Sequence, residues 1–232
     1  MPQMHATNQA VRTSELFGQL NSFEAKYAPE GLYLAGDASL LSGGRRVSIV
    51  GTRKPSPEGM ARARALTRML VAEGIIVVSG LAEGIDTVAH ETAMAEGGRT
   101  ITVLGTPLSQ AYPARNRDLL ERIKAGHLAI SQFPEGMPAR RTNFPQRNRT
   151  MALISDATVI IEAGENSGTR HQGWEALRLG RMVFLMQSVA ENPDLTWPKE
   201  MIGYGAQILR REDMPDVLHD IPGFTAASVS AF

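Results

Sequence analysis

Val47-Ser48-Ile49-Val50-Gly51-Thr52-Arg53 is the stretch of this chain that decides the fold. A short apolar run stopped by a glycine is typical of a buried strand that ends at the ligand crevice of a doubly wound α/β domain. Gly51 has no Cβ, so its backbone can approach an anion closely. The helix that follows directs the positive end of its dipole at the same place, and the planar guanidinium of Arg53 suits a phosphate. We therefore predict a phosphate site at Gly51, Thr52 and Arg53.

Strand and helix patterns alternate regularly around this stretch. We predict strands over 47–50, 75–79, 100–104, 128–132, 157–162 and 182–186, the last of these being the final strand. Helices are predicted over 57–73, 85–96, 116–125, 143–154 and 170–179. Such alternation indicates an α/β fold with a doubly wound, mostly parallel sheet and helices on both faces.

The chain divides into three segments on the same evidence. Residues 1–44 form an N-terminal lead-in, with a helix expected over 14–28 and a short edge strand over 32–34. Residues 45–190 form the core, and residues 191–232 form a C-terminal extension in which the periodic pattern decays after Gln187. The end of that extension, from Thr225 to Phe232, is predicted to be a flexible tail.

Composition excludes several classes of protein. The chain has 232 residues, of which 43% are hydrophobic and 21% charged, as in soluble globular proteins. No apolar run approaches the ~18 residues that span a bilayer, and no secretory signal opens the chain, so we expect a cytoplasmic protein without membrane contact. It has no cysteine, and its five histidines are scattered without metal-ligand spacing. We therefore expect no metal site and no cofactor.

The charge is balanced overall but uneven locally. There are 24 basic and 24 acidic residues, which argues against a protein coated in positive charge. Residues 140–149 nevertheless contain four arginines and no acid, close to Phe133 and Phe144. Arginines that track a backbone beside aromatic rings suit single-stranded nucleic acid. The alternative is that both rings fill the core and the arginines are solvated, and the pattern leaves both interpretations open.

Glycine and a polar or charged neighbour follow four of the predicted strands. These strand ends should meet at one edge of the sheet, where open α/β sheets bind ligands. They read Gly51-Thr52-Arg53, Ser79-Gly80, Gly105-Thr106 and Glu162-Ala163-Gly164. Asp86 and His90 share a helix face nearby. They are either an acid–base pair or, as we favour because no nucleophile or metal accompanies them, a helix-start residue and a partner inside the fold.

The same motifs, in order and spacing, closely resemble those of the DNA-processing protein A family, also called Smf, of bacterial transformation and recombination. The matching segments are 50–53, 79–86 with His90, 103–106, 112–116, 143–149 and 162–168. The resemblance covers residues 32–187 and implies an extended Rossmann-like fold, a homodimer and single-stranded DNA binding. It also implies that DNA is handed to the RecA recombinase, and it implies no catalytic activity.

The resemblance also implies a set of DNA- and phosphate-binding residues. Phe144 would offer a stacking surface, and the loop at Ser167 and Gly168 would close the pocket. The complete set is Gly51, Thr52, Arg53, Ser79, Gly80, Gly105, Thr106, Arg115, Asn143, Phe144, Arg147, Asn148, Arg149, Ser167, Gly168, Thr169 and Arg170.

We expect a stand-alone, divergent core, because few residues lie outside the core and two motifs depart from the family pattern. Ser167-Gly168-Thr169-Arg170 replaces serine-glycine-serine-leucine, and Gln187-Ser188 replaces the usual closing proline-glycine. A second function therefore stays open, that of a nucleotide-sensing protein or a nucleoside-monophosphate phosphoribohydrolase of the same superfamily. Gly168-Thr169 followed by Glu175 weakly resembles the hydrolase motif.

Overall fold

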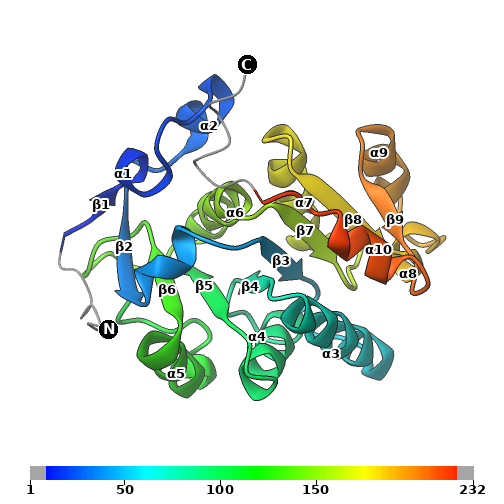
Figure 1. Cartoon of the computed structure of the whole chain (residues 1–232), viewed down its shortest axis with the longest axis horizontal. Coiled ribbons are helices and arrows are strands. Elements are labelled where there is room, and N and C mark those ends of the chain that lie inside the picture. The colour runs from blue at the N-terminus through cyan, green and yellow to red at the C-terminus, as the bar shows by residue number, and fades with distance from the viewer. Residues whose placement is uncertain (1–8, 224–232) are drawn as a thin grey trace.

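The computed structural model describes residues 9–223, which form a nine-stranded sheet flanked by helices (Figure 1). Across the sheet the strands follow the order β1-β2-β6-β5-β4-β3-β7-β8-β9. Strands β6 through β9 in that order run parallel, whereas β2 is antiparallel to β6 and β1 is antiparallel to β2. The predicted doubly wound α/β fold is confirmed. The strands are β1 (Val11–Arg12), β2 (Gly31–Gly36), β3 (Arg46–Val50), β4 (Ile76–Ser79), β5 (Thr100–Leu104), β6 (Leu128–Ser131), β7 (Ala157–Ile160), β8 (Met182–Met186) and β9 (Gln207–Leu209).

The order of strands reverses between β3 and β7. From β3 the chain builds outward through β4 and β5 to β6, and it then returns to β7, which lies beside β3 with Val50 opposite Ile160. The loops after β3 and β7 therefore leave the sheet in opposite directions. This is the topological switch point at which open α/β sheets form their ligand crevice.

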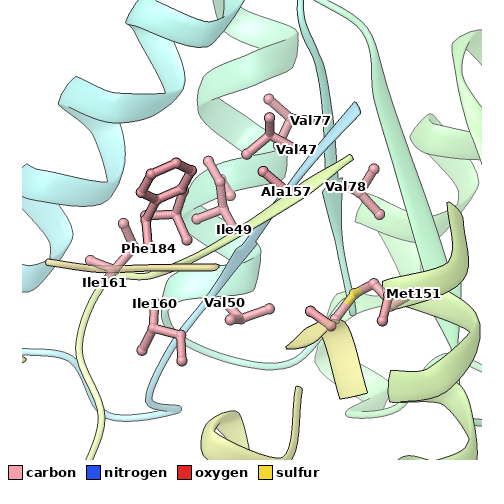
Figure 2. Close-up of a cluster of buried hydrophobic side chains, with 14 of the residues drawn as sticks. Val47, Ile49, Val50, Val77, Val78, Met151, Ala157, Ile160, Ile161 and Phe184 are labelled. Carbon is pink, nitrogen blue, oxygen red and sulfur yellow. The ribbon is translucent and has the colours of Figure 1, made fainter. Parts of the chain in front are cut away.

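Helices cover both faces of the sheet. Figure 1 shows α3 (Pro57–Ala72), α4 (Ile85–Ala95) and α5 (Arg117–Gly126) along one face, and α6 (Asn143–Ile154) and α7 (Thr169–Arg178) along the other. All five residues of β3 are buried. A strand covered on both faces is expected to be largely apolar rather than alternating. The two polar residues of β3 are buried with hydrogen-bond partners: Arg46 donates to the carbonyls of Ile154 and Leu41, and Ser48 bonds to Ser155. Figure 2 shows the resulting core, in which side chains of β3, β4, β7 and β8 gather with Met151 of α6.

The N-terminal lead-in differs from its prediction. The single helix expected over 14–28 is wrong, because the structure has two short helices, α1 (Thr13–Phe17) and α2 (Ser22–Tyr27). Gly18, with φ of 68°, ends the first helix, and the side chain of Asn21 starts the second by accepting the N–H of Glu24. The expected edge strand over 32–34 is also not an edge, because β2 pairs with β1 on one side and β6 on the other.

The C-terminal segment also differs. Residues 182–186 are not the final strand, because β9 adds to the sheet in parallel beside β8. It is accompanied by α8 (Gln187–Ala190), α9 (Trp197–Gly203) and α10 (Met214–His219). These elements are too short for a periodic signal, and Trp197, Met201 and Leu218 are buried by tertiary packing instead. The three-segment division stays a prediction, and the predicted flexible tail lies outside the described residues.

Within residues 9–223, no helix combines the length and the apolar character that crossing a membrane requires.

Candidate functional site

A cavity with a volume of about 550 Å³ lies at the carboxyl edge of the sheet, where the loops after β3 and β7 separate. Volumes of this size are typical of small-molecule and cofactor sites. Three basic side chains and one acidic side chain line it, which favours an anionic ligand. The lining residues are Val50, Gly51, Thr52, Arg53, Lys54, Ala82, Asp86, Phe144, Arg147, Asn148, Met151, Gly164, Asn166, Ser167, Gly168, Thr169 and Gln172.

The rim of the cavity is formed by the turn after β3. The N–H of Thr52 donates to the Glu162 carbonyl at 2.7 Å, which ties this turn to the end of β7. A Cβ on Gly51 would lie 2.5 Å from Cγ1 of Ile85, so the turn needs a glycine. Arg53 and Lys54 are exposed, and neither forms an ion pair within residues 9–223. Both charges are therefore free to meet an anion.

Two aromatic rings lie beside this rim. Phe144 in the first turn of α6 is half-buried, and its ring centroid lies 5.1 Å from that of Tyr112, which is 46% exposed. The guanidinium carbon of Arg53 lies 6.0 Å from the Phe144 centroid. We call these three side chains the aromatic ledge. Phe133, by contrast, is only 4% exposed and fills the core, so the two phenylalanines have different surroundings.

Arg147 forms the floor of the cavity and is almost fully buried. Its Nη1 donates to the carbonyls of Gly80 at 2.6 Å and Val103 at 2.9 Å, and its Nε donates to Oδ1 of Asn148 at 3.1 Å. A Cβ on Gly80 would lie 1.8 Å from Nη1, so this arginine fits only because residue 80 is a glycine. Burial lowers the pKa of Arg147, although the charge of Asp86 opposes this effect.

Asp86 lies beside Arg147 in the first turn of α4. Its carboxylate accepts the N–H groups of Gly80 at 3.2 Å and Ala82 at 3.3 Å, so it organises the turn between β4 and α4. Burial raises the pKa of Asp86, against the opposing effects of Arg147 and these N–H groups. His90 is fully buried, and its Nδ1 lies 2.7 Å from Oγ1 of Thr100. Both residues are thus engaged with the fold.

Several residues of the predicted set have their polar groups occupied inside the protein. The hydroxyl of Ser79 donates to the Ile49 carbonyl at 2.7 Å, and that of Thr106 to the Gln110 carbonyl at 2.5 Å. The amide of Asn143 donates to the Gly105 carbonyl at 3.2 Å. Gly105 supports the aromatic ledge, since a Cβ there would lie 2.8 Å from the Phe144 ring.

Three predicted arginines lie outside the cavity lining and interact with neighbouring groups. Arg115 pairs with Glu83 at 2.9 Å, and Arg149 pairs with Glu175 at 3.4 Å. Arg170 donates to the Glu165 carbonyl at 3.3 Å. The structure thus brings together the following members of the predicted set in one cavity: Gly51, Thr52, Arg53, Phe144, Arg147, Asn148, Ser167, Gly168 and Thr169. Their role in binding stays a prediction.

Other residues of the site were not singled out from the sequence. Lys54 directly follows Arg53, so its position was available from the chain alone. Tyr112 occurs in a matched motif, but only the fold brings its ring to Phe144. Gln172 lies three residues after Thr169 on α7, a helical spacing that places both on one face. The other lining residues outside the predicted set are Val50, Ala82, Asp86, Met151, Gly164 and Asn166.

Comparison with known families matches residues 11–222 to the model of DNA recombination-mediator protein A. The DNA processing protein DprA of Bacillus subtilis is 32% identical over 194 residues, which are 84% of this chain and 65% of that protein. Protein Smf of Synechocystis is 39% identical over 167 residues, covering 72% of this chain and 42% of that protein. This chain thus spans between two fifths and two thirds of the length of these relatives.

Solved structures agree with this match. DprA of Streptococcus pneumoniae superposes with a TM-score of 0.79 at 30% identity, over 92% of this chain and 74% of that one. DprA of Helicobacter pylori, whose structure gives insights into its single-stranded DNA binding mode, superposes with a TM-score of 0.76 at 25% identity, over 92% and 93%. A molybdenum cofactor binding protein of Rippkaea orientalis, with a TM-score of 0.56 at 17% identity over 76% and 96%, shares the fold.

Proposed function

This chain belongs to the family of DNA recombination-mediator protein A, and from that premise we propose that it binds single-stranded DNA. The strand would lie along the carboxyl edge of the sheet, with a phosphate at the turn formed by Gly51, Thr52 and Arg53. The loop of Ser167, Gly168 and Thr169 would face it from the opposite side of the cavity.

The aromatic ledge is the observation that supports this proposal most directly. A half-buried ring next to a second, exposed ring offers a surface on which a base can stack, and stacking tolerates every base. Arg53 lies over the same ring and is free of ion pairs among the described residues, so it can meet the adjacent phosphate. The stacking surface favours a single strand, because a duplex conceals the faces of its bases, and the charge of Arg53 binds the phosphates. Little sequence preference is expected.

The replacement Arg53→Ala tests the phosphate contact. A charge-assisted hydrogen bond contributes ~1.5–3 kcal/mol, so affinity for an oligonucleotide should fall by that amount in a titration at low salt. The slope of affinity against salt concentration should also decrease, because fewer counterions are released. Arg122→Ala is the matched control, since Arg122 is exposed on α5, away from the cavity lining. Equal affinities of the two variants, or no preference of the wild type for single-stranded over duplex DNA, would refute the proposal.

We propose binding without hydrolysis. Glu175, which the hydrolase alternative would use, pairs with Arg149 at 3.4 Å and Arg178 at 3.0 Å and is not among the residues that line the cavity. Incubation with nucleoside monophosphates, with and without magnesium, should leave them intact in chromatography. Release of free base that disappears in Glu175→Gln would favour the hydrolase instead.

Assembly and delivery are further parts of the proposal. We propose a cytoplasmic homodimer that passes its DNA to a RecA-type recombinase, as the family resemblance implies. Light scattering of the purified chain tests the dimer. A recombinase filament assay on strands coated with a single-strand binding protein tests the delivery, and no gain in filament formation would limit this chain to binding.

A further inference from the structure

The loop between β7 and α7 forms one wall of the cavity, and little inside the cavity supports it. We call residues 164–169 the cavity loop, and all of them except Glu165 line the cavity. A Cβ on Gly164 or Gly168 would meet no described atom within 4 Å, so nothing packs closely against these two positions. The hydroxyls of Ser167 and Thr169 lie 2.8 Å apart and bond to each other inside the loop. The loop therefore needs support from outside the cavity to keep one shape.

Glu165 connects the cavity loop to a distant part of the chain. Its carboxylate oxygens accept the N–H of Thr196 at 2.9 Å and the hydroxyl of the same residue at 2.5 Å. These bonds span 31 positions of the sequence. The hydrogen bonds from Thr196, followed by the charge of Arg170, lower the pKa of Glu165. They thus favour the ionised form, whose two oxygens can accept both bonds.

Thr196 is a firm anchor because it belongs to a packed element. It is the N-cap of α9, yet its side chain makes no capping hydrogen bond within residues 9–223. A threonine at this position usually accepts an N–H of its own helix, whereas here the hydroxyl donates to Glu165. The next residue, Trp197, is only 3% exposed. Met201 of the same helix packs on α7, since a Cβ on Gly173 would lie 2.8 Å from its Sδ. The anchor is therefore fixed by the core.

We propose that Glu165 is a positioning residue, which through Thr196 holds the cavity loop in the shape that it presents to the ligand. The inference rests on the proposed function in taking that ligand to be a single strand. It gives the C-terminal extension, predicted over 191–232, a part in the site. Glu165 itself does not line the cavity, and its negative charge alone would repel the phosphates of a strand. Its contribution to binding therefore has the opposite sign to that of its charge.

Two replacements that remove the same charge test this assignment in a fluorescence titration with oligo(dT). The amide of Glu165→Gln can accept the N–H of Thr196 and donate to its hydroxyl, so the connection is kept. Glu165→Leu keeps neither bond, so the loop must be ordered when the strand binds. Glu165→Leu should therefore bind about fivefold more weakly than Glu165→Gln, since a smaller fraction of its molecules is competent to bind. Equal binding by the two variants would mean that only the charge matters and would refute the assignment.

Hydrogen exchange of the free protein separates positioning of the loop from a general structural role. The backbone amides of residues 164–169 should exchange faster in Glu165→Leu than in Glu165→Gln, with no difference in the central strands. The melting temperatures should be nearly equal, because the bonds to Thr196 lie at the surface. A fall of several degrees together with faster exchange throughout the sheet would mean that Glu165 serves the fold, and would overturn the assignment.

A double replacement tests whether Glu165 acts through Thr196. Thr196→Val removes the hydroxyl but keeps the N–H, so affinity for oligo(dT) should fall by about twofold. Added to Glu165→Leu, it should cause no further loss, because the two residues serve one connection. Independent, additive losses would overturn the assignment. Glu200→Leu, at an exposed position of α9, is the charge-matched control, and it should neither weaken binding nor change the exchange of the loop.

The remaining outcomes distinguish this inference from the proposed function. If the wild type binds oligo(dT) and both Glu165 variants bind alike, single-stranded DNA binding stands and the role of Glu165 is refuted. If the wild type does not bind oligo(dT), the proposed function fails, and hydrogen exchange of the free protein decides on Glu165. Faster exchange of residues 164–169 in Glu165→Leu than in Glu165→Gln would then support its role in positioning the loop, and equal exchange would refute it.

Discussion

Two halves of the carboxyl edge of the sheet share one sequence signal but differ in structure. In the open half, the residues after β3 and β7 (51–54 and 164–169) surround a cavity with exposed cations at its rim. In the closed half, the residues at the ends of β4 and β5 (Ser79–Gly80 and Gly105–Thr106) are buried. Arg147 donates to the carbonyl of Gly80, and Asn143 donates to that of Gly105. A glycine at a strand end thus permits a close approach, but the approaching group can be a ligand or a side chain of the protein itself.

The two halves also differ in how much space surrounds their glycines. A Cβ on Gly80 would collide with Arg147 at 1.8 Å, whereas a Cβ on Gly164 or Gly168 would meet no atom within 4 Å. Gly51 is the exception in the open half, because a Cβ there would lie 2.5 Å from Ile85. In the closed half the side chain of Arg147 fills the space beside Gly80, whereas in the open half a cavity remains beside the loop that carries Gly164 and Gly168. Stability should therefore depend on the closed half, and binding should depend on the open half.

The largest expected effect is the loss of stability in Arg147→Met. This replacement removes the donor to two buried carbonyls and leaves Asp86 without its nearby positive charge, so we expect the free energy of unfolding to fall by ~3–5 kcal/mol. Urea unfolding measures it. Arg53→Met, in the open half, should change stability by less than ~0.5 kcal/mol. Similar stabilities of the two variants would abolish the distinction between the halves.

The glycines should respond with opposite signs. Gly80→Ala should destabilise the protein by ~1–3 kcal/mol, because the added methyl group must displace Arg147. Gly168 has φ of −60° and ψ of −17°, which alanine adopts without strain. Gly168→Ala should therefore stabilise by ~0.4–1 kcal/mol through the unfolded state. Thermal unfolding of both variants checks this pair, and a loss of stability in both would show that the open half is packed as well.

Replacements of Phe144 in the aromatic ledge test whether the open half serves DNA binding rather than stability. Phe144→Leu preserves much of the packing against Gly105 but removes the aromatic face, so DNA affinity should fall by ~1–3 kcal/mol. Stability should change by less than ~1.5 kcal/mol, as in other hydrophobic exchanges of similar volume. Phe144→Tyr keeps the ring and should bind like the wild type in the same fluorescence titration. A fall in melting temperature without loss of affinity would make Phe144 a packing residue.

The titration of His90 shows whether water reaches the interior beside the closed half. It lies on α4, which packs against β4 and β5, and burial, followed by the positive charges of His127 and Arg147, lowers its pKa from 6.5 to about 3. At a pH between these two pKa values, the His90 imidazole is protonated in the unfolded state but not in the folded state. Stability should therefore fall by ~1.4 kcal/mol per pH unit as the pH drops from 6.5 toward 3.

The variant His90→Gln isolates this contribution. Its absolute stability differs from that of the wild type, so the slopes of stability against pH are compared instead. Between pH 6.5 and 4, the slope of the unfolding free energy against pH should be shallower in the variant by ~1.4 kcal/mol per pH unit. Identical slopes would mean that His90 titrates normally and that water reaches this side of the sheet.

Local signals in the sequence were sufficient for the central elements. The bounds of β5, β8 and α6 agree with the predictions. For β5 and β8 the reason is that each is a short, largely apolar run bounded by turn residues. The same reasoning failed at both ends of the chain. Residues 13–27 form two helices, because Gly18 interrupts a pattern that looked continuous. The strand at 207–209 is only three residues long and depends on its pairing with β8.

The sequence by itself determined the doubly wound α/β fold, its family and the edge of the sheet at which the cavity lies, because these follow from strand–helix alternation and from motifs in a set order. Only the tertiary structure decided which strand ends stay open. That outcome depends on which side chain reaches each glycine from a distant element, as Arg147 reaches Gly80 across 67 positions of the chain. It also depends on contacts between distant segments, such as the bond from Thr196 to the carboxylate of Glu165 across 31 positions of the chain.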